Sequence, residues 1–398
     1  MIAFEEALKR ILAEAAPLPA ETVGVAEAFG RVLAEDLAAR VSHPPVAVSA
    51  MDGYAVRAAD IAAVPVTLRQ TSAVAAGDAP GRPVGAGECA RIFTGAPLPP
   101  GADTIVIQEN AEAKGESVTV LHKAAKGRYV RPAGLDFAAG DVLLQAGRRL
   151  TARDIGLVAA MNIPWMRVRR RPRVAVLATG NEIAMPGEDL SGARIVGSNS
   201  LALRALVESC GGEAVDLGIA PDDRDTLGAM ADGARGCDLL LTTGGASVGD
   251  HDLVRSTLGA KGLDLAFWKI AMRPGKPLMF GRLGEIPLIG LPGNPVSTLI
   301  CGLLFVGPFL RALTGLPPGP ATEAARLGAD LPANDERRDH LRASLAGGVA
   351  TPFSRQDSSM MARLAEADCL IVRPVHAPPA RAGDEVEIIS FGTGEAGL

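Results

Sequence analysis

The chain has 398 residues, with 40 Lys and Arg against 45 Asp and Glu, which gives a formal net charge of −5. At roughly 100–200 residues per domain, this length predicts two to four domains. A hydrophobic content of 48% with 21% charged residues excludes a wholly disordered chain. The slight acidity also argues against a protein that binds nucleic acid through bulk positive charge.

Cysteine usage and the N-terminus bear on the compartment. Five cysteines stand singly, with no CxxC pair, which is typical of neither a disulfide framework nor a zinc site. The first residues, MIAFEEALKRILAEA, have apolar side chains at helical spacing with charges between them, as in an amphipathic helix and not a signal peptide. The longest apolar run, 299–310, is shorter than the roughly 20 residues that cross a bilayer. We therefore expect a cytoplasmic protein that does not enter a membrane.

The N-terminal part of the chain changes texture near residue 50. Residues 1–40 are predicted to be helical, whereas 50–137 contains short β-type runs separated by Gly and Pro clusters. This pattern predicts a compact β module inserted into the N-terminal part. A helix is then expected over 151–161.

Residues 173–311 alternate between buried strands and amphipathic helices. The predicted strands are 173–178, 213–219, 238–242 and 286–291, and the predicted helices are 198–210, 224–234 and 296–310. Alternation of this kind predicts a mostly parallel sheet covered on both faces. A Pro/Gly-rich stretch at 315–319 then opens into a small C-terminal β module, with strands near 369–373 and 385–389.

Three glycine-bearing turns follow strands of this sheet: Thr179-Gly180, Gly244-Gly245 and Pro292-Gly293. Ligands of open α/β sheets bind at the carboxyl ends of the strands, where glycine lets the backbone approach an anion closely. Each turn alone would be ordinary turn chemistry, but three turns at one edge predict a binding crevice. The sequence has neither a Walker A motif nor a GxGxxG with its acidic partner, which disfavours P-loop and dinucleotide enzymes.

Carboxylates accompany the turns. Glu182 follows the first strand, Asp222 follows another strand end, and Asp252 follows the Gly-Gly turn, while Asp52 and Asp136 lie in and beside the inserted region. A lone acid after a strand often caps a helix, and for Asp222 that alternative stays open. Several acids beside anion-binding turns would repel an anion, which implies a bridging hard cation such as Mg²⁺.

A cationic segment follows in the run FWKIAMRPGKP (residues 267–277). Its Lys269, Arg273 and Lys276 stand in an otherwise apolar stretch broken by Pro and Gly. Surface strands also carry cations, but this arrangement favours an oxyanion pocket.

Five motifs together resemble the molybdopterin molybdenumtransferase family, which includes bacterial MoeA and the E domain of gephyrin. They are SAMDGYAV (49–56), RIFTGA (91–96), TGGASVG (243–249), FWKIAMRPGKP (267–277) and LPGNPVS (291–297). The resemblance covers nearly the whole chain, with the motifs in the family's order.

The resemblance implies a multidomain α/β fold and an elongated homodimer. The α/β molybdopterin-binding domain has three layers, and the cleft would form between it and the N-terminal region of the other subunit. The expected domains are an N-terminal mixed helical domain (1–45 and 138–170), an inserted β domain (46–137), the α/β domain (171–315) and a C-terminal β barrel (320–398).

The family's functional positions also carry over to this chain. The expected catalytic and metal-binding residues are Asp52, Glu182, Asp222 and Asp252. Together with the glycine turns, the expected substrate-binding residues are Thr94, Arg131, Asp136, Thr179, Gly180, Gly244, Gly245, Ser247, Lys269, Arg273, Lys276, Pro292, Gly293, Asn294, Pro295 and Ser358. Within the SAMDGYAV motif, Gly53 is expected to permit a tight turn that frees Asp52 to project into a cleft.

Some positions depart from the family pattern. Val46–Val48 replaces an acid or amide before SAMDGYAV, Ala133 and Leu135 stand where Arg and Glu are usual, and Asn181 stands where Asp is common. His251 occupies a frequent Tyr position, while Arg273 keeps the charge of the Lys found in some members.

The implied activity belongs to molybdenum cofactor biosynthesis. The enzyme would take adenylylated molybdopterin and molybdate, insert the metal and release AMP, with Mg²⁺ as cofactor. Molybdopterin adenylyltransferase and molybdoenzyme chaperones are possible partners, and neither nucleic acid nor a membrane is expected. Two alternatives remain: an adenylyltransferase acting one step earlier, or a non-catalytic scaffold like gephyrin.

Overall fold

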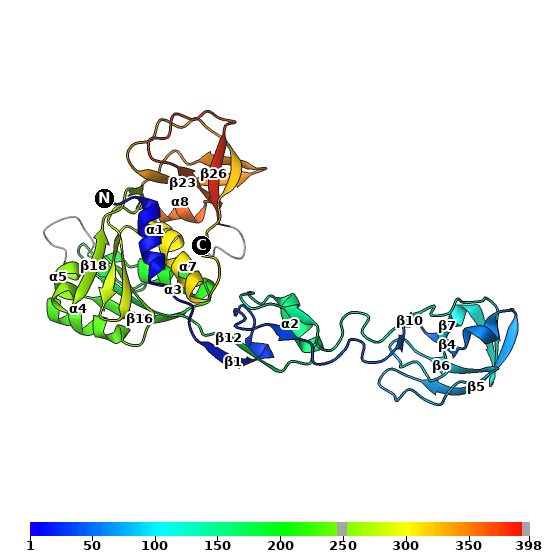
Figure 1. Ribbon diagram of the computed structural model, residues 1–398. Helices are drawn as coiled ribbons and strands as arrows, with labels where there is room; N and C mark the ends of the chain where they lie inside the picture. The colour runs from blue at the N-terminus through cyan, green and yellow to red at the C-terminus, as the bar shows by residue number, and fades with distance from the viewer. Residues whose placement is uncertain (245–252, 392–398) are drawn as a thin grey trace. The chain divides into compact units, whose positions relative to one another are not determined.

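The computed structural model describes residues 1–244 and 253–391 and contains two compact units. Unit 1 comprises Met1–Glu21, Gly30–Val32 and Val168–Leu398, and unit 2 comprises Thr22–Phe29 and Leu33–Arg167. Figure 1 shows both units and labels some of their helices and strands.

A six-stranded mixed sheet forms the centre of unit 1. Its order is β16 (Glu213–Ala220), β13 (Arg173–Thr179), β17 (Leu239–Thr243), β21 (Ile286–Leu291), β20 (Met279–Leu283) and β18 (Leu263–Trp268). The first four strands run parallel, β20 runs antiparallel to β21, and β18 runs antiparallel to β20, in the same direction as the first four. The prediction of a mostly parallel sheet is confirmed.

Helices cover both faces of this sheet (Figure 1). One face packs against α1 (Phe4–Ala13), α3 (Asn199–Ser209) and the helix formed by α6 (Pro295–Cys301), η5 (Gly302–Val306) and α7 (Gly307–Leu313). The other face packs against α4 (Arg224–Ala231), η4 (Asp232–Ala234) and α5 (Leu253–Ala260). Alternate residues of β13 enter the two cores, as the period of two in a strand requires. A short pair, β14 (Ile183–Ala184) and β15 (Ile195–Val196), precedes α3.

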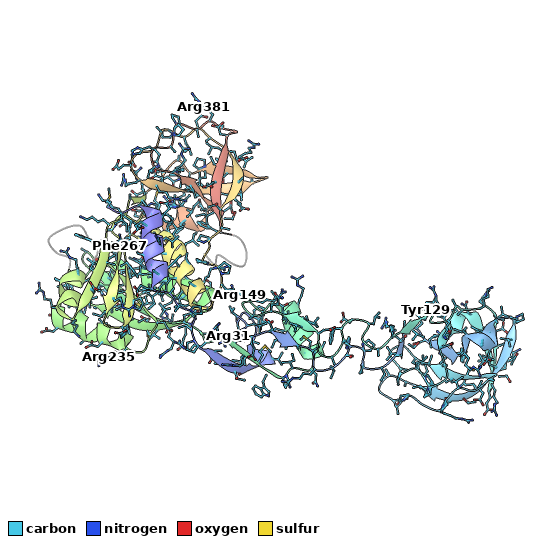
Figure 2. The ribbon with its side chains drawn as sticks, viewed as in Figure 1. Arg31, Tyr129, Arg149, Arg235, Phe267 and Arg381 are labelled. Carbon is cyan, nitrogen blue, oxygen red and sulfur yellow. The ribbon has the colours of Figure 1, made fainter. Side chains whose placement is uncertain are left out.

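The apolar segment near residue 300 is longer than the sequence suggested. Pro295–Leu313 is a 19-residue helix with a mean hydropathy of 1.9 and 89% of its hydrophobic window buried. In length and composition it could cross a membrane, so the expectation that the run is too short was wrong. Its burial shows that it is packed as a core helix. Phe267, labelled in Figure 2, is buried in the same core with its ring centroid 5.7 Å from that of Phe280.

The C-terminal part of unit 1 is a closed five-stranded barrel. Its strands are β22 (Glu323–Leu327), β23 (Arg338–Ala346), β24 (Val349–Pro352), β25 (Cys369–Arg373) and β26 (Glu385–Ser390), and α8 (Met361–Ala365) precedes β25. Closure comes from the antiparallel pairing of β23 with β25. The two-residue strand β19 (Met272–Arg273) adds to β23 and so ties the cationic segment to the barrel.

Unit 2 contains a six-stranded sheet within the region predicted to be an inserted β module. Its order is β7 (Thr104–Ile107), β4 (Gly53–Val56), β6 (Glu88–Ile92), β5 (Val66–Val74), β9 (Ser117–Val120) and β8 (Ala111–Lys114), with η2 (Ala58–Ile61) and η3 (Gln108–Asn110) between strands. Shorter pairs join β2 (Leu37–Ala38) to β11 (Val142–Leu144) and β3 (Val48–Ser49) to β10 (Val130–Arg131). The helix α2 (Ala152–Ala160) begins with a capping box between Thr151 and Asp154.

The prediction of helix over residues 1–40 was wrong beyond the first ten-residue helix. α1 ends at Ala13, and the next elements are β1 (Ala20–Gly24), which pairs with β12 (Trp165–Arg169), and η1 (Val25–Glu27). Pro17 and Pro19 lie between α1 and β1. Because proline lacks a main-chain N–H and clashes with the preceding turn, the helix cannot continue through them.

Gly53 is required for a reason that differs from the predicted tight turn. It is the first residue of β4, between β6 and β7, and it does not have a positive φ. A Cβ on Gly53 would lie 2.0 Å from the carbonyl oxygen of Val106. The glycine therefore permits close approach of β7 beside Asp52.

We expect Gly53→Ala to lower the free energy of unfolding by about 1–3 kcal/mol, because β7 would have to move to admit the methyl group. Thermal unfolding of the variant measures this. Gly156→Ala is the matched control, since a Cβ on Gly156 in α2 meets no atom within 4 Å and alanine favours a helix. Equal stability of the two variants would contradict the close-approach explanation.

Candidate active site

The three glycine turns meet at one edge of the mixed sheet. Their strands end in register, with Ala178 paired to Thr243 and Thr243 paired to Leu291. Gly244 has a φ of 89°, and a Cβ there would lie 2.3 Å from the carbonyl oxygen of Thr179. A Cβ on Gly293 would lie 3.7 Å from the Cα of Gly244. The described residues of the three turns therefore lie together, with their main-chain atoms in close approach, and the binding crevice expected there stays a prediction.

Asn199, at the start of α3, ties two of the turns together. Its Nδ2 donates to Thr243 Oγ1 at 2.9 Å and to the carbonyl oxygen of Gly293 at 2.8 Å. Sequence reasoning missed this residue, because an asparagine at a helix start is common and nothing in its spacing identifies its partners. Through Asn199, the first turn of α3 fixes the relative position of the second and third turns.

Two of the predicted carboxylates lie at the first turn. A Cβ on Gly180 would lie 2.4 Å from Oε2 of Glu182, so the Glu182 carboxylate folds over this glycine. The main-chain N–H of Asn181 donates to Oδ2 of Asp222 at 3.3 Å, and the N–H of Asp222 donates to Oδ1 of Asn181 at 3.1 Å. The structure thus places the Glu182 carboxylate beside Gly180 and the Asp222 carboxylate beside Asn181, the next residue of the same turn.

The residue after Asp222, and not Asp222 itself, caps the following helix. Asp223 is the N-cap of α4, and its carboxylate accepts from the main-chain N–H of Thr226 at 2.8 Å. The cap is therefore supplied by Asp223, and the Asp222 carboxylate faces the first glycine turn instead.

The remaining members of the predicted metal set are placed differently. Asp52 belongs to unit 2, and Asp252 lies outside the described residues together with Gly245, Ser247 and His251. Within residues 1–244 and 253–391, no group of three or more His, Cys, Asp or Glu side chains is close enough to hold a metal ion. The four-carboxylate site stays a prediction.

Asp52 is fixed by Thr94 in unit 2. The main-chain N–H and the hydroxyl of Thr94 donate to Oδ1 of Asp52 at 2.7 and 2.8 Å. These donors, the main-chain N–H first, hold the pKa of Asp52 below its usual range, with a smaller contribution from Arg91. Two residues predicted to act in the site are thus directly bonded.

Arg131 and Asp136 also lie together in unit 2, lining a pocket of about 630 Å³. Val46 and Leu135, two of the departures from the family pattern, line the same pocket. Both are exposed apolar side chains. The departures therefore add apolar wall beside the predicted charged residues.

The three predicted cations have different surroundings. The ammonium of Lys269 lies 4.1 Å from the centroid of the Trp268 ring, and Lys276 is exposed. Arg273 instead forms ion pairs with Asp335 and Asp339 of the barrel segment, the second at 3.2 Å. Oxyanion binding stays a prediction for all three. The guanidinium of Arg273 is already paired with two carboxylates.

Ser358 is held against the third turn by a buried arginine that sequence reasoning missed. Its hydroxyl accepts from Asn294 Nδ2 at 2.8 Å, and its carbonyl accepts from the N–H of Val296 at 3.1 Å. Arg342, only 1% exposed, donates to the carbonyl oxygens of Asp357 and Met360 at 2.9 and 3.1 Å. An Arg at an inward strand position was the only signal in the sequence.

We expect Thr94→Val to raise the pKa of Asp52 toward its ordinary value, because the hydroxyl donor is lost while the main-chain donor remains. Since the pKa of Asp52 is depressed, its contribution to stability is present above the unfolded pKa and is lost as pH falls through the folded value. A pH titration of the Asp52 carboxyl carbon by NMR measures the shift. Thr119→Val is the control, because it removes only a hydroxyl that is hydrogen-bonded to Thr67. An Asp52 pKa that is the same in Thr94→Val as in the original chain would contradict the role of the Thr94 hydroxyl.

Comparison with known proteins identifies the family. "MoeA N-terminal region (domain I and II)" matches residues 2–162, "Probable molybdopterin binding domain" matches 175–312, and "MoeA C-terminal region (domain IV)" matches 324–391. The chain is 36% identical over 380 residues to Molybdopterin molybdenumtransferase 2 of Mycobacterium tuberculosis, covering 92% of this chain and 94% of the relative. It is 34% identical over 392 residues to the Molybdopterin molybdenumtransferase of Nostoc sp., covering 93% and 88%.

A solved structure shows the same fold. The chain matches the crystal structure of a molybdopterin biosynthesis MoeA protein from Pyrococcus horikoshii with a TM-score of 0.86 and 32% identity, over 99% of this chain and 100% of that one. The multidomain α/β fold with a C-terminal barrel, expected from the resemblance, is confirmed. The chain belongs to the MoeA family of molybdopterin molybdenumtransferases.

Proposed function

We propose that the chain inserts molybdenum into molybdopterin, taking molybdate and adenylylated molybdopterin as substrates and releasing AMP. The observation that carries the proposal is the contact of three glycine turns at one sheet edge, with Glu182 and Asp222 at the first turn. Main-chain N–H groups at such an edge suit a phosphate-bearing ligand. The metal-insertion step is supported by the relatives of this chain, which are named molybdopterin molybdenumtransferases.

The anionic substrates would be held by the turns and by cations. Lys269 and Lys276 supply two ammonium groups on the segment between β18 and β20. Arg273 would contribute only by exchanging Asp335 or Asp339 for a substrate oxyanion. Asn199 keeps two turns in register, so that their main-chain atoms face one ligand together.

Magnesium fits the donor chemistry of the first turn. Glu182 and Asp222 offer carboxylate oxygens, which Mg²⁺ prefers. When bound, Mg²⁺ would polarise the pyrophosphate linkage so that AMP can leave. Asp52 and Asp252 would complete the set, and the hydrogen bonds from Thr94 that lower the pKa of Asp52 favour its ionised form.

We also propose a cytoplasmic homodimer, because the family resemblance implies a cleft completed by the N-terminal region of a second copy. In that arrangement Asp52, Thr94, Arg131 and Asp136 of unit 2 would act on substrate held by the other subunit. The mass of the purified protein in solution tests the dimer directly.

Purified protein should release AMP from adenylylated molybdopterin only when molybdate and Mg²⁺ are both present. Chromatographic quantification of AMP measures the reaction, with omission of molybdate and chelation of Mg²⁺ as controls. Absence of AMP release under the complete conditions would refute the proposed activity.

The two rival functions give different results in the same assay. An adenylyltransferase consumes ATP with bare molybdopterin, whereas this chain should not. A scaffold turns over neither substrate. Retention of Asp52, Glu182 and Asp252 disfavours a scaffold, since a scaffold has no use for metal-binding carboxylates.

Neighbouring aspartates supply a matched pair for the carboxylate roles. Asp222→Ala should lose most turnover with little change in the thermal midpoint. Asp223→Ala should keep turnover but lose about 0.5–2 kcal/mol of stability, because it removes the cap of α4. Asp52→Ala and Glu182→Ala should behave like Asp222→Ala, and their defects should lessen at raised Mg²⁺. If the alanine variant of Asp52, Glu182 or Asp222 melts at a much lower temperature yet keeps normal turnover per folded molecule, the catalytic role proposed for that residue is wrong.

A further inference from the structure

The cationic segment lies between two parts of unit 1 that are distant in sequence. On one side, Ile2 forms a parallel bridge with Ile270. The N–H of Ile2 donates to the carbonyl oxygen of Lys269 at 3.2 Å, and the N–H of Ala271 donates to the carbonyl oxygen of Ile2 at 2.8 Å. On the other side, the N–H of Arg338 donates to the carbonyl oxygen of Ala271 at 3.0 Å. Ile2 thus acts as a one-residue strand at the edge of this segment.

Lys269 adopts a backbone conformation that needs outside support. Its φ is +85°, in the region that a residue with a Cβ disfavours. Its own N–H donates to the carbonyl oxygen of Leu278 at 3.1 Å, and its carbonyl accepts from Ile2. The peptide groups on both sides of Lys269 are therefore held, one by the carbonyl oxygen of Leu278 and the other by the N–H of Ile2.

The side chain of Lys269 follows from this backbone. Its ammonium lies 4.1 Å from the centroid of the Trp268 ring, on the residue immediately before it. A change of φ at Lys269 would rotate the side chain away from the ring and from the edge of β18. The residue that carries this predicted oxyanion-binding cation is thus hydrogen-bonded through its carbonyl oxygen to the N–H of residue 2.

Ile2 is itself anchored by the helix that begins two residues later. Phe4 of α1 is 8% exposed and lies with its ring centroid 5.2 Å from that of Phe305. The guanidinium carbon of Arg338 lies 4.8 Å from the Phe4 ring centroid, and Arg338 also forms an ion pair with Glu5. These contacts leave Ile2 little freedom to move relative to β23.

We propose that Ile2 is a positioning residue whose main-chain N–H holds Lys269 in the left-handed conformation that presents its ammonium to an oxyanion. The link to oxyanion binding rests on the proposed function, but the effect of Ile2 on the Lys269 backbone does not. The first can therefore fail while the second holds.

The test removes the main-chain donor of residue 2. Ile2→Pro removes the N–H, whereas Ile2→Ala removes the side-chain packing but keeps the N–H, and Ile2→Val keeps both. Residue-resolved hydrogen exchange should show the amides of Lys269 and Ala271 exchanging about three- to tenfold faster in Ile2→Pro. Both amides keep their own acceptors, Leu278 and Ile2, but the segment that holds them loses the stabilisation of one hydrogen bond, from the Ile2 N–H to the carbonyl oxygen of Lys269. The amides of Phe280 and Ile289 should not change, and Ile2→Val should match the original chain. Equal exchange in Ile2→Pro and Ile2→Ala would overturn the proposal.

Steady-state kinetics with molybdate as the varied substrate then test the link to binding. Ile2→Pro should raise KM for molybdate about three- to tenfold with little change in kcat, because the cation is displaced and not removed. An unchanged KM beside faster exchange would overturn the binding link alone. If the original chain releases no AMP, the proposed function fails, while hydrogen exchange still decides the role of Ile2.

The unaltered chain provides a second measurement if Ile2→Pro does not fold. The Ala271 amide should then exchange much more slowly than that of Gly284, which lies in the turn between β20 and β21. Exchange of Ala271 at the rate of that exposed turn would show that the bridge to Ile2 is not formed, and would overturn the proposal.

Discussion

The candidate site depends on the close approach of main-chain atoms at the carboxyl edge of the mixed sheet. Parallel pairing of β13, β17 and β21 ends all three strands at one edge, and Gly244 leaves only 2.3 Å between the position of a Cβ and the carbonyl oxygen of Thr179. No other residue type fits there without moving the first strand. Polar side chains contact the same turns: Asn199 donates to the carbonyl oxygen of Gly293, and the Glu182 carboxylate lies beside Gly180.

The cations of the 267–277 segment differ in their partners in a way that composition does not reveal. Arg273 connects the α/β sheet to the barrel through ion pairs and through the pairing of β19 with β23, so part of its role is structural. Lys269 and Lys276 have no such carboxylate partner among the described residues. Under the proposed function, an anion would bind Arg273 only by displacing Asp335 or Asp339.

The carboxylates also separate by environment. Asp52 accepts two hydrogen bonds from Thr94, which favour its charged form. Asp222 is bonded to the neighbouring turn through Asn181, and Asp223 takes the capping role that would otherwise have explained an acid at this place. Two side chains one residue apart thus differ in their contacts. Asp223 caps the helix, and the Asp222 carboxylate accepts from the main-chain N–H of Asn181 at the first glycine turn.

Local pattern determined much of the architecture. Strands were correctly predicted at 173–178, 238–242 and 286–291, since the burial pattern of a strand is a property of a short segment. Five motifs also determined the family. Only the tertiary structure decided that Gly53 makes room for Val106, that Arg342 holds the Ser358 loop and that Ile2 supports Lys269. Those contacts join residues far apart in the chain, and no local spacing records which distant segment will pack against which.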